Sequence, residues 1–547
     1  MTFAGLSPRP FARITAAAAA AVLLMAGCTQ DDVGPDRSTG SASDGGGATQ
    51  HAPAGEADLP LTEIGTSAAQ DLGTDPATDP AYAEYYEQSV QWGECEDVAN
   101  PDAECGTITV PLAWNDPSAG DIEIAVARIA ATGEATGSLV VNPGGPGASG
   151  VNFLESAPYL ISPEVSSSYD LVGFDPRGVA RSAGIECLSD EETDEYRSVT
   201  AEAGTPEADQ LAEEWNTRLA DACEQNSGDV LAYLDTYSAA RDMDVLRAAL
   251  DSEQLDYLGY SYGTYLGATY ADLYADRVGK FVLDGAMDPT ITMDELSAGQ
   301  AEGFEQATEA FLQDCLDSAD SCPFSGDPAA AKDELISFFE SVDDEPLETD
   351  DPQRPLTGAL ARSAVMSMLY SDQSWTEGRE ALTAAMEGDG QPLLAIADRS
   401  AERLPDGTYR TNSTYAITAV NCLDHPGIAD EQWQDQEAER LAEEFPTFGP
   451  TMGNDNSPCA QWPEPALREP APIAAEGAGP IVVIGTTGDP ATPYKWAESL
   501  ADQLDSASLL TFEGNGHTAY GRSGGCIEEQ VDAYLLEDTV PEDGLTC

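Results

Sequence analysis

The feature of this 547-residue chain that most restricts its fold is a sharp turn between an apolar run and a helical pattern. The run LDYLG (255–259) leads into GYSYG (259–263), and TYLGATYADLYADR (264–277) follows. A chain that passes directly from a strand into a helix needs small residues two before and two after the central one, and glycine stands at both places. We therefore expect a strand, a tight turn and a helix in succession, with Ser261 at the turn and helical N–H groups facing it.

Other short apolar runs predict further strands, and helical patterns separate them. The predicted strands are GTITVPL (106–112), DIEIAVARI (121–129), SLVVN (138–142), YDLVGFD (169–175), LDYLG (255–259), KFVLDG (280–285), PIVVIG (480–485) and ASLLTFEG (507–514). This alternation predicts a mainly parallel sheet covered by helices. Between about 290 and 470 helical spacing takes over. Together with the turn at Ser261, these patterns predict the α/β class and an α/β-hydrolase fold, with a mainly parallel central sheet and an inserted helical cap.

The first 28 residues have the layout of an export signal, with no acidic residue, two arginines and then an apolar run. The run is too short for a membrane-spanning helix. It ends in LMAGC, which resembles a bacterial lipobox. We therefore predict a lipoprotein signal peptide over 1–28 and acylation of Cys28 after cleavage. Ordinary secretion with an unmodified Cys28 is the alternative.

The remaining chain divides into four parts by composition and pattern. Residues 29–90 are rich in Gly, Ser, Ala, Pro and Asp, and they predict a disordered tether. The folded region is expected to start near Trp92. It comprises a first part of the hydrolase core (91–290), the helical cap insertion (291–470) and the C-terminal part of the core (471–547).

Cysteine usage indicates an oxidising compartment. The chain has eleven cysteines, and ten remain if Cys28 carries a lipid. Disulfides are expected in an exported protein, but the sequence does not define their connectivity. The simplest scheme joins neighbours: Cys95–Cys105, Cys187–Cys223, Cys315–Cys322, Cys422–Cys459 and Cys526–Cys547. No Cys or His cluster has the spacing of zinc ligands, so we predict no metal and no cofactor.

The charge of the chain excludes some partners. It carries 99 acidic and 23 basic residues, a formal net charge of −76. Binding to nucleic acid or to anionic lipid headgroups is therefore electrostatically unfavourable. We expect a heavily hydrated acidic surface, with attraction of cationic substrates as the alternative. Contact with a membrane is expected only through the lipid anchor.

Two serines lie in a G-x-S-x-G pattern, and their contexts differ. Ser261 follows an apolar run and precedes a helical pattern, the arrangement of a nucleophile elbow, so we interpret it as the nucleophile. GRSGG (521–525) also fits the pattern. No apolar strand leads into it and no histidine suited to a triad follows it. We therefore interpret Ser523 as part of a glycine-rich loop.

A serine nucleophile needs a general base, and imidazole is the usual one near neutral pH. The chain has three histidines. His51 lies in the expected tether, and His425 lies in the helical block, where we interpret it as structural. His517 follows the last predicted strand, where the triad histidine of this fold belongs. His517 is therefore the expected base.

The histidine in turn needs a carboxylate that sets its tautomer. Asp489 follows the strand PIVVIG and precedes His517, which gives the order Ser, Asp, His of α/β-hydrolases. Asp505 and Glu513 are the alternatives. Acyl transfer also needs donors for the oxyanion. NPGGPG (142–147) follows the strand SLVVN, and we expect the N–H groups of Gly145 and Tyr262 to form this site; a structural Gly-Pro turn is the alternative.

Several segments together resemble the secreted actinobacterial tripeptidyl aminopeptidase family, α/β-hydrolases related to proline iminopeptidases. They are NPGGPGASG, GFDPRGVARS, AARDMDVLRAAL, LGYSYGTYLGATYA, VLDGAMDP and GDPATP with GNGH. The resemblance extends from about Trp92 to Cys547, apart from most of the helical block. It implies catalytic Ser261, Asp489 and His517, oxyanion donors at Gly145 and Tyr262, and a structural turn at 175–178. Proline iminopeptidases usually carry HGGPG, so NPGGPG favours the tripeptidyl branch.

The resemblance implies a secreted, lipid-anchored serine exopeptidase. Such an enzyme releases short, tripeptide-like N-terminal peptides through an acyl-enzyme and acts on peptides with a free N-terminus. A carboxylesterase or lipase-like hydrolase on the same triad is the alternative, because the fold does not fix the substrate. A non-catalytic surface-binding lipoprotein is a more remote one. We expect the protein outside the cell, either anchored on the outer face of the membrane or secreted.

Overall fold

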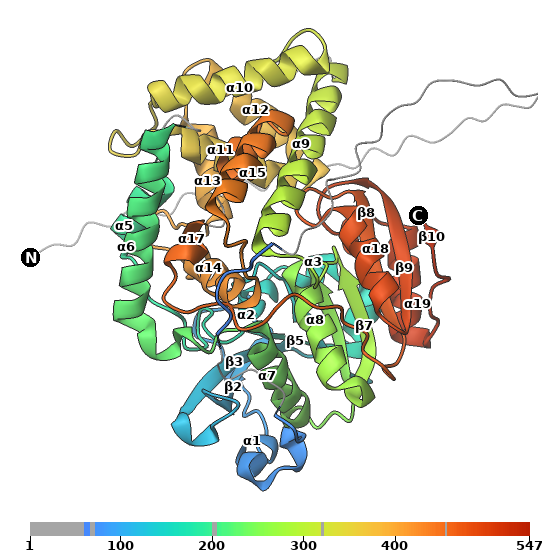
Figure 1. Ribbon diagram of the computed structural model, residues 1–547. Helices are drawn as coiled ribbons and strands as arrows, with labels where there is room; N and C mark the ends of the chain where they lie inside the picture. Colours follow the sequence, from blue (N-terminus) through green and yellow to red (C-terminus); the bar gives the residue numbers. More distant parts are fainter. Residues whose placement is uncertain (1–58, 66–71, 200–204, 319–321, 454–456) are drawn as a thin grey trace, which may run out of the picture. The chain divides into compact units, whose positions relative to one another are not determined.

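The computed structural model describes residues 59–65, 72–199, 205–318, 322–453 and 457–547 (Figure 1). Its strands are β1 (Gly93–Glu94), β2 (Ala103–Pro111), β3 (Asp121–Ile129), β4 (Gly137–Asn142), β5 (Tyr169–Phe174), β6 (Leu255–Tyr260), β7 (Val278–Asp284), β8 (Ile481–Gly488), β9 (Ala507–Asn515) and β10 (Leu545–Thr546). They form one ten-stranded sheet in the order β1-β2-β3-β5-β4-β6-β7-β8-β9-β10. The expected export signal and Cys28 lie outside the described residues.

The sheet is mainly parallel, as predicted. The pairs β1–β2, β2–β3 and β3–β5 are antiparallel, and every pair from β5 to β10 is parallel. The eight strands expected from apolar runs are all present. The pattern missed only β1 and β10, two short edge strands whose length is too small for an alternating signal.

Helices outside residues 291–470 contribute to the cores on both faces of the sheet, and all of them except the first lie between strands in sequence. They are α1 (Ala83–Tyr86), α2 (Gly150–Phe153), α3 (Ala157–Leu160), α4 (Pro163–Ser168), α5 (Asp190–Arg197), α6 (Pro206–Leu231), α7 (Thr236–Ala249), α8 (Tyr262–Leu273), α18 (Tyr494–Gln503) and α19 (Cys526–Glu537). In β8, Val483 packs in a core with α7, α8 and α18. Its neighbour Val482 packs in a second core with α2, α4 and α19. Successive side chains of a strand point to opposite faces of the sheet. Because both faces of these central strands are buried, their sequences are continuous apolar runs rather than alternating apolar and polar residues.

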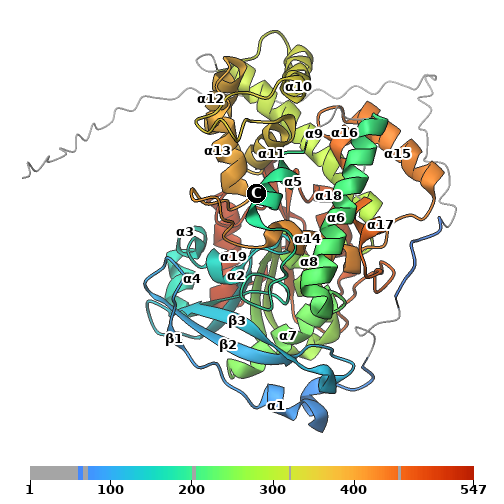
Figure 2. The same ribbon diagram turned by 90° about the vertical axis from the view of Figure 1, so that its left-hand side faces the viewer.

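A second group of helices forms the expected cap. It consists of α9 (Met293–Asp317), α10 (Pro328–Asp344), α11 (Gly358–Leu369), α12 (Trp375–Met386), α13 (Gln391–Ser400), α14 (Ser413–Asp424), α15 (Glu431–Glu444), α16 (Gly449–Met452) and α17 (Ser457–Gln461). Helices α9 to α13, α15 and α16 share a hydrophobic core of their own, with buried Phe304, Phe311, Leu335 and Leu382. Helix α14 packs instead in the core on one face of the sheet, for example through Leu423. Helix α6, from earlier in the chain, lies beside α17 (Figure 2). The helical part above the sheet therefore includes a helix from before residue 290.

The ordered chain begins earlier than the composition predicts. The expectation of a disordered tether over 29–90 is wrong for residues 59–65, where Leu61 and Ile64 form β-bridges with later segments. It is also wrong for residues 72–90, which contain two 3₁₀ turns and α1. Tyr82 and Tyr85 are 7% and 2% exposed. The Tyr82 ring stacks on Trp114 at 5.6 Å, and the Tyr85 hydroxyl donates to Asp121 at 2.6 Å. Buried aromatic rings supply enough apolar contact to order a segment whose average composition is polar.

Ten cysteines form five disulfides, and each disulfide joins two cysteines that are consecutive in the sequence. The pairs are Cys95–Cys105, Cys187–Cys223, Cys315–Cys322, Cys422–Cys459 and Cys526–Cys547. This is the simplest of the schemes that the sequence allows. Bridges of this number are typical of proteins that fold outside the reducing cytosol. Within the described ranges, no helix combines the length and the apolar content needed to cross a membrane.

Candidate active site

Ser261 lies at the turn between β6 and α8, where the sequence predicts it. Its backbone has φ 55° and ψ −126°, a strained conformation for a residue other than glycine. Its N–H donates a 2.9 Å hydrogen bond to the carbonyl oxygen of Asp284 at the end of β7. A Cβ atom on Gly259 would lie 2.4 Å from the carbonyl oxygen of Gly263. The turn therefore excludes side chains on both sides of the serine, as a nucleophile elbow requires.

Asp489 and His517 follow β8 and β9 and form a hydrogen-bonded pair. The imidazole Nδ1 lies 2.9 Å and 3.0 Å from the two carboxylate oxygens of Asp489. Asp489 is 3% exposed, and its carboxylate also accepts the N–H groups of Ala491, Thr492 and Thr518. These donors fix the carboxylate, and the carboxylate fixes the imidazole with its Nε2 free for chemistry.

The end of β7 brings the serine turn and the histidine loop together. Asp284 accepts the N–H of Ser261, as described above. A Cβ atom on the next residue, Gly285, would lie 3.2 Å from the Cε1 atom of His517. Ser261, Asp489 and His517 therefore all lie at the carboxyl edge of the parallel sheet, where they follow β6, β8 and β9. This edge is where ligands bind in open α/β sheets.

The glycine-rich segment after β4 lies against the serine turn. A Cβ atom on Gly144 would lie 2.9 Å from the Cβ of Ser261 and 3.0 Å from the amide nitrogen of Tyr262. Gly144 and Gly145 have φ values of 90° and 110°, which favour glycine. The segment therefore brings the Gly145 region next to the start of α8, as the expected pair of oxyanion donors requires.

The Tyr262 side chain connects the serine turn to the cap. Its hydroxyl lies 2.5 Å from that of Thr236, which donates at 2.6 Å to Asp424 at the end of α14. Burial, followed by the nearby charge of Asp235, raises the pKa of Asp424 to about 7. This buried network fixes the first residue of α8, which carries one of the expected oxyanion donors.

Asp284 is a site residue that sequence reasoning missed. Its side chain is fully buried, and its carboxylate accepts the N–H groups of Ala519 at 3.0 Å and Tyr520 at 2.7 Å. Burial raises the pKa of Asp284 to about 7, although these two donors and His517 act in the opposite direction. Asp284 thus links β7 to the loop that carries His517. The available signal was an acid at the end of an otherwise apolar strand, in VLDGAMDP.

Arg522 is a second missed residue, and it contacts the same loop through carbonyl groups. Its guanidinium donates to the carbonyl oxygens of Asn515 at 2.8 Å and Thr518 at 2.6 Å, on either side of His517. Its side chain is 12% exposed and also faces Asp372 at 3.4 Å. The arginine in GRSGG could have drawn attention to this position, because basic residues are few in this chain.

The interpretation of Ser523 as part of a glycine-rich loop agrees with its surroundings. The Ser523 hydroxyl donates to Glu528 at 3.4 Å, and the N–H of Gly524 donates to the same carboxylate at 2.7 Å. The loop therefore attaches the start of α19 to the histidine loop. His425 is also structural: it is 3% exposed, its Nδ1 lies 3.1 Å from the Ile291 carbonyl oxygen, and burial lowers its pKa.

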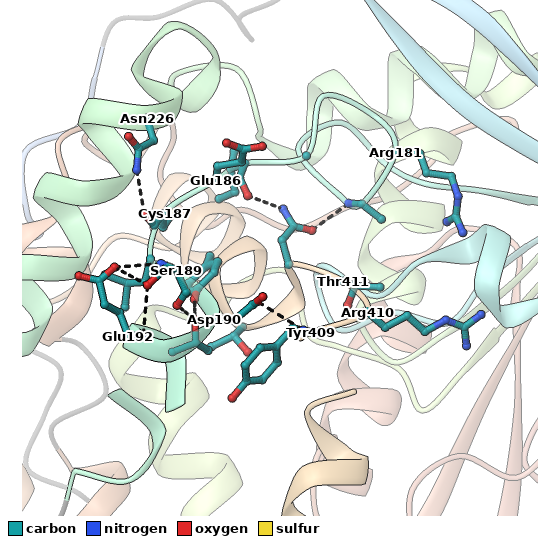
Figure 3. A pocket seen from close by; sticks show the side chains of 18 of the residues that line it. Arg181, Glu186, Cys187, Ser189, Asp190, Glu192, Asn226, Tyr409, Arg410 and Thr411 are labelled. Carbon is teal, nitrogen blue, oxygen red and sulfur yellow. Dashed lines mark hydrogen bonds between the residues drawn. The ribbon is translucent and has the colours of Figure 1, made fainter. Parts of the chain in front are cut away.

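A cavity of about 810 Å³ lies between the loop after β5 and the segment before α14 (Figure 3). Arg181, Glu192 and Arg410 are among its lining residues. Arg181 pairs with Asp97 and Asp175, and Arg410 pairs with Glu155, so these basic groups are already compensated. The triad residues do not line it. Among the described residues, including those that line this cavity, no group of three His, Cys, Asp or Glu side chains is arranged to hold a metal ion.

Comparisons with known proteins show which family the chain resembles along most of its length. The family model described as "TAP-like protein" matches residues 444–547, which include Asp489 and His517. "Serine protease Hip1" of Mycobacterium tuberculosis is 37% identical over 479 residues, 84% of this chain and 91% of the relative. "Carboxylesterase B" of the same species is 38% identical over 469 residues, 83% and 89% of the two chains. "Tripeptidyl aminopeptidase" of Streptomyces coelicolor is 31% identical over 478 residues, 84% and 86% of the two chains.

These relatives cover most of both chains, and the identity is high enough to establish common descent. The resemblance seen in the sequence segments is therefore confirmed, and so is the α/β-hydrolase fold. At the level that these relatives share, the protein is a serine hydrolase. The chain belongs to the tripeptidyl-aminopeptidase-like (TAP-like) family of α/β-hydrolases.

Proposed function

We propose that the protein is a secreted serine exopeptidase that releases short, tripeptide-like segments from the free N-terminus of peptides. The observation that supports the proposal is the Asp489–His517 pair, joined at 2.9 Å, at the sheet edge where the strained turn of Ser261 also lies. A buried carboxylate, an oriented imidazole and an activated serine are the parts that acyl transfer needs.

The proposed reaction proceeds in two halves. The Ser261 hydroxyl oxygen bonds to the substrate carbonyl carbon, and its proton passes to Nε2 of His517. The N–H groups of Gly145 and Tyr262 stabilise the negative oxygen that forms. The imidazolium then gives its proton to the departing amine as the C–N bond breaks. Water then gives a proton to the same imidazole as its oxygen bonds to the acyl carbon. The ester C–O bond breaks, the released peptide leaves as a carboxylic acid, and the imidazolium returns its proton to the Ser261 oxygen.

Exopeptidase activity is supported by the helical cap above the carboxyl edge of the sheet and by the relative named as a tripeptidyl aminopeptidase. A cap limits how far a substrate can extend past the cleaved bond. An aminopeptidase must also bind the substrate ammonium group at a fixed distance from Ser261, and a carboxylate in a partly buried pocket does this best. The acidic composition supplies many such groups.

The second candidate is a carboxylesterase, favoured by the relative of that name, which is 38% identical. A comparison of free and N-acetylated tripeptidyl anilides, beside short-chain nitrophenyl esters, separates the two. For an aminopeptidase, acetylation leaves a carboxylate unpaired and lowers kcat/KM by at least about a hundredfold. Equal rates on the two anilides, or turnover of esters alone, would reject the exopeptidase in favour of the esterase.

We also propose that Cys28 carries lipid and holds the mature protein on the outer face of the membrane. Support comes from the LMAGC sequence and from the fact that the other ten cysteines pair among themselves. Two or more acyl chains give stable anchoring. Cys28→Ser should release the protein or leave it unprocessed. An unmodified Cys28 in the mature protein by mass spectrometry would contradict the proposal.

A further inference from the structure

Tyr370, just past the end of α11 in the cap, touches His517 in two ways. Its carbonyl oxygen accepts the N–H of His517 at 2.8 Å. Its ring lies edge-on to the imidazole, with ring centres 5.3 Å apart and an interplanar angle of 88°. The main chain of the cap thus fixes the histidine loop, and the Tyr370 side chain lies directly beside the expected base.

The Tyr370 ring is reachable from solvent although protein surrounds it. It is 40% exposed, whereas the two residues before it, Met368 and Leu369, are 2% and 0% exposed. On the cap side its ring contacts Phe304 at 5.6 Å. Burial, and then the charge of Asp489, raises the pKa of Tyr370 to about 12, so its hydroxyl stays neutral at physiological pH. Part of this neutral ring is thus enclosed by protein, and the rest is open to contact with an apolar group of a bound molecule.

The chemistry of acyl transfer indicates which part of the substrate lies next to Tyr370. The imidazole that takes the serine proton must afterwards give it to the leaving group, so the leaving group lies next to Nε2 of His517. A side chain that flanks the imidazole and is open to solvent therefore flanks the leaving group. The acyl part of the substrate lies on the other side of the bond, next to the oxyanion donors.

We propose that Tyr370 forms one wall of the leaving-group subsite and gives the enzyme a preference for leaving groups that carry an aromatic ring. In a peptide this is an aromatic residue directly after the cleaved bond. In an ester it is an aryl-bearing alcohol such as benzyl alcohol. The proposal rests on the proposed acyl-transfer function but not on peptides being the substrates. Contacts between aromatic rings correspond to a preference of about threefold to tenfold.

The structure allows the side chain to be tested apart from the main chain. Tyr370→Ala removes the ring but keeps the carbonyl group that accepts the His517 N–H. Tyr370→Phe keeps the ring and removes only the hydroxyl, and Tyr370→Leu keeps apolar volume if the alanine variant is unstable. Tyr159→Ala is a matched control, because Tyr159 is 87% exposed on α3 and makes none of these contacts with His517.

The experiment measures kcat/KM on substrates with one acyl group and different leaving groups. The peptide pair is a free tripeptide joined to phenylalanine amide or to alanine amide, and the ester pair is a benzyl and an ethyl ester. We expect the wild type, Tyr370→Phe and Tyr159→Ala to favour the aromatic member of each pair about threefold to tenfold. Tyr370→Ala and Tyr370→Leu should turn over both members of a pair at similar rates.

Two results would overturn the proposal. One is an aromatic preference that persists in Tyr370→Ala or Tyr370→Leu. The other is an equal loss on both members of each pair, which a merely structural role of the ring would cause. The ester pair keeps this test separate from the proposed function. If only esters are hydrolysed, the exopeptidase proposal fails, and the benzyl-to-ethyl ratio still decides the role of Tyr370.

Discussion

The guanidinium of Arg522 lies against the main chain of Thr518, and its Nη2 and Nε atoms lie 2.6 Å and 3.2 Å from that residue's carbonyl oxygen. Thr518 directly follows His517, so Arg522 holds the main chain next to the imidazole. Charged donors form stronger hydrogen bonds than neutral ones, and a planar guanidinium can reach several carbonyl groups at once. Arg522 is therefore a positioning residue for the histidine loop.

Arg522→Met should lower kcat by about tenfold to a hundredfold, because a small displacement of a catalytic group has an effect of that order. Arg522→Lys should recover part of the loss, since an ammonium group reaches one carbonyl. Arg399→Met is the control, because the Arg399 side chain is 61% exposed and forms its ion pair with the exposed Glu377. The measurement is kcat and KM with the pH profile of kcat/KM. A loss confined to KM, or none at all, would contradict the positioning role.

Ser261→Ala and His517→Ala should each lower kcat by on the order of a thousandfold or more. A fluorophosphonate probe should label the wild type at Ser261 and should not label the alanine variant. Ser523→Ala is the matched control, because Ser523 lies in the same sequence pattern but contacts Glu528. Full activity in Ser261→Ala, or probe attachment at Ser523, would exclude the assigned nucleophile.

The dependence of stability on pH should reveal the buried carboxyl of Asp284. Its folded-state pKa is raised from 3.8 to about 7 by burial, so between these values the folded state binds the proton more tightly than the unfolded chain. This contribution is complete below about pH 4 and is lost as the pH rises toward 7. Asp284→Asn should therefore show a smaller decline in stability over this window, by on the order of a few kcal/mol.

Urea denaturation of the wild type and Asp284→Asn, repeated from pH 4 to 8, measures this difference. Asp276→Asn, at an exposed position, is the control and should follow the wild type. Parallel curves for the wild type and Asp284→Asn would show that the Asp284 carboxyl does not titrate in this window, and would refute the prediction.

Much of the fold was predictable because its signals are local. The strands around Ser261, Asp489 and His517 are apolar runs next to turns, and each of the three residues follows its strand directly or closely. Asp284 and Arg522 were missed for a different reason. Both side chains bind main-chain groups of the loop after β9, and such groups leave no mark on the residue type at that position. For Asp284 this loop is also far away in the sequence. Tyr370 was missed because nothing in a helical pattern shows which turn of the cap reaches the histidine.

The extent of the ordered chain was misjudged in the segment before residue 91. Average composition there is that of a tether, but Tyr82 and Tyr85 find partners in Trp114 and Asp121. Composition averages over residues and therefore hides a few aromatic side chains that bury well. Such anchors become visible only when the packing partners are known.

Two disulfides of the helical insertion allow a test of how the bridges stabilise the fold. Cys422–Cys459 spans 37 residues and joins α14 to α17, whereas Cys315–Cys322 spans 7 residues at the end of α9. A bridge that closes a longer loop restricts the unfolded chain more. Loop-closure entropy gives about 4 kcal/mol for the longer loop and about 2 kcal/mol for the shorter one. Replacing both cysteines of each pair by alanine should therefore destabilise the protein more for Cys422–Cys459.

The measurement is the urea midpoint of each double variant under non-reducing conditions, together with residual activity. Cys422 lies two residues before Asp424, whose carboxylate is linked through Thr236 to Tyr262, the residue after Ser261. Loss of Cys422–Cys459 should therefore also lower kcat, whereas loss of Cys315–Cys322 should leave it nearly unchanged. Equal destabilisation by the two changes would contradict the loop-entropy argument, and an unchanged kcat in both would show that the Asp424 network does not need this bridge.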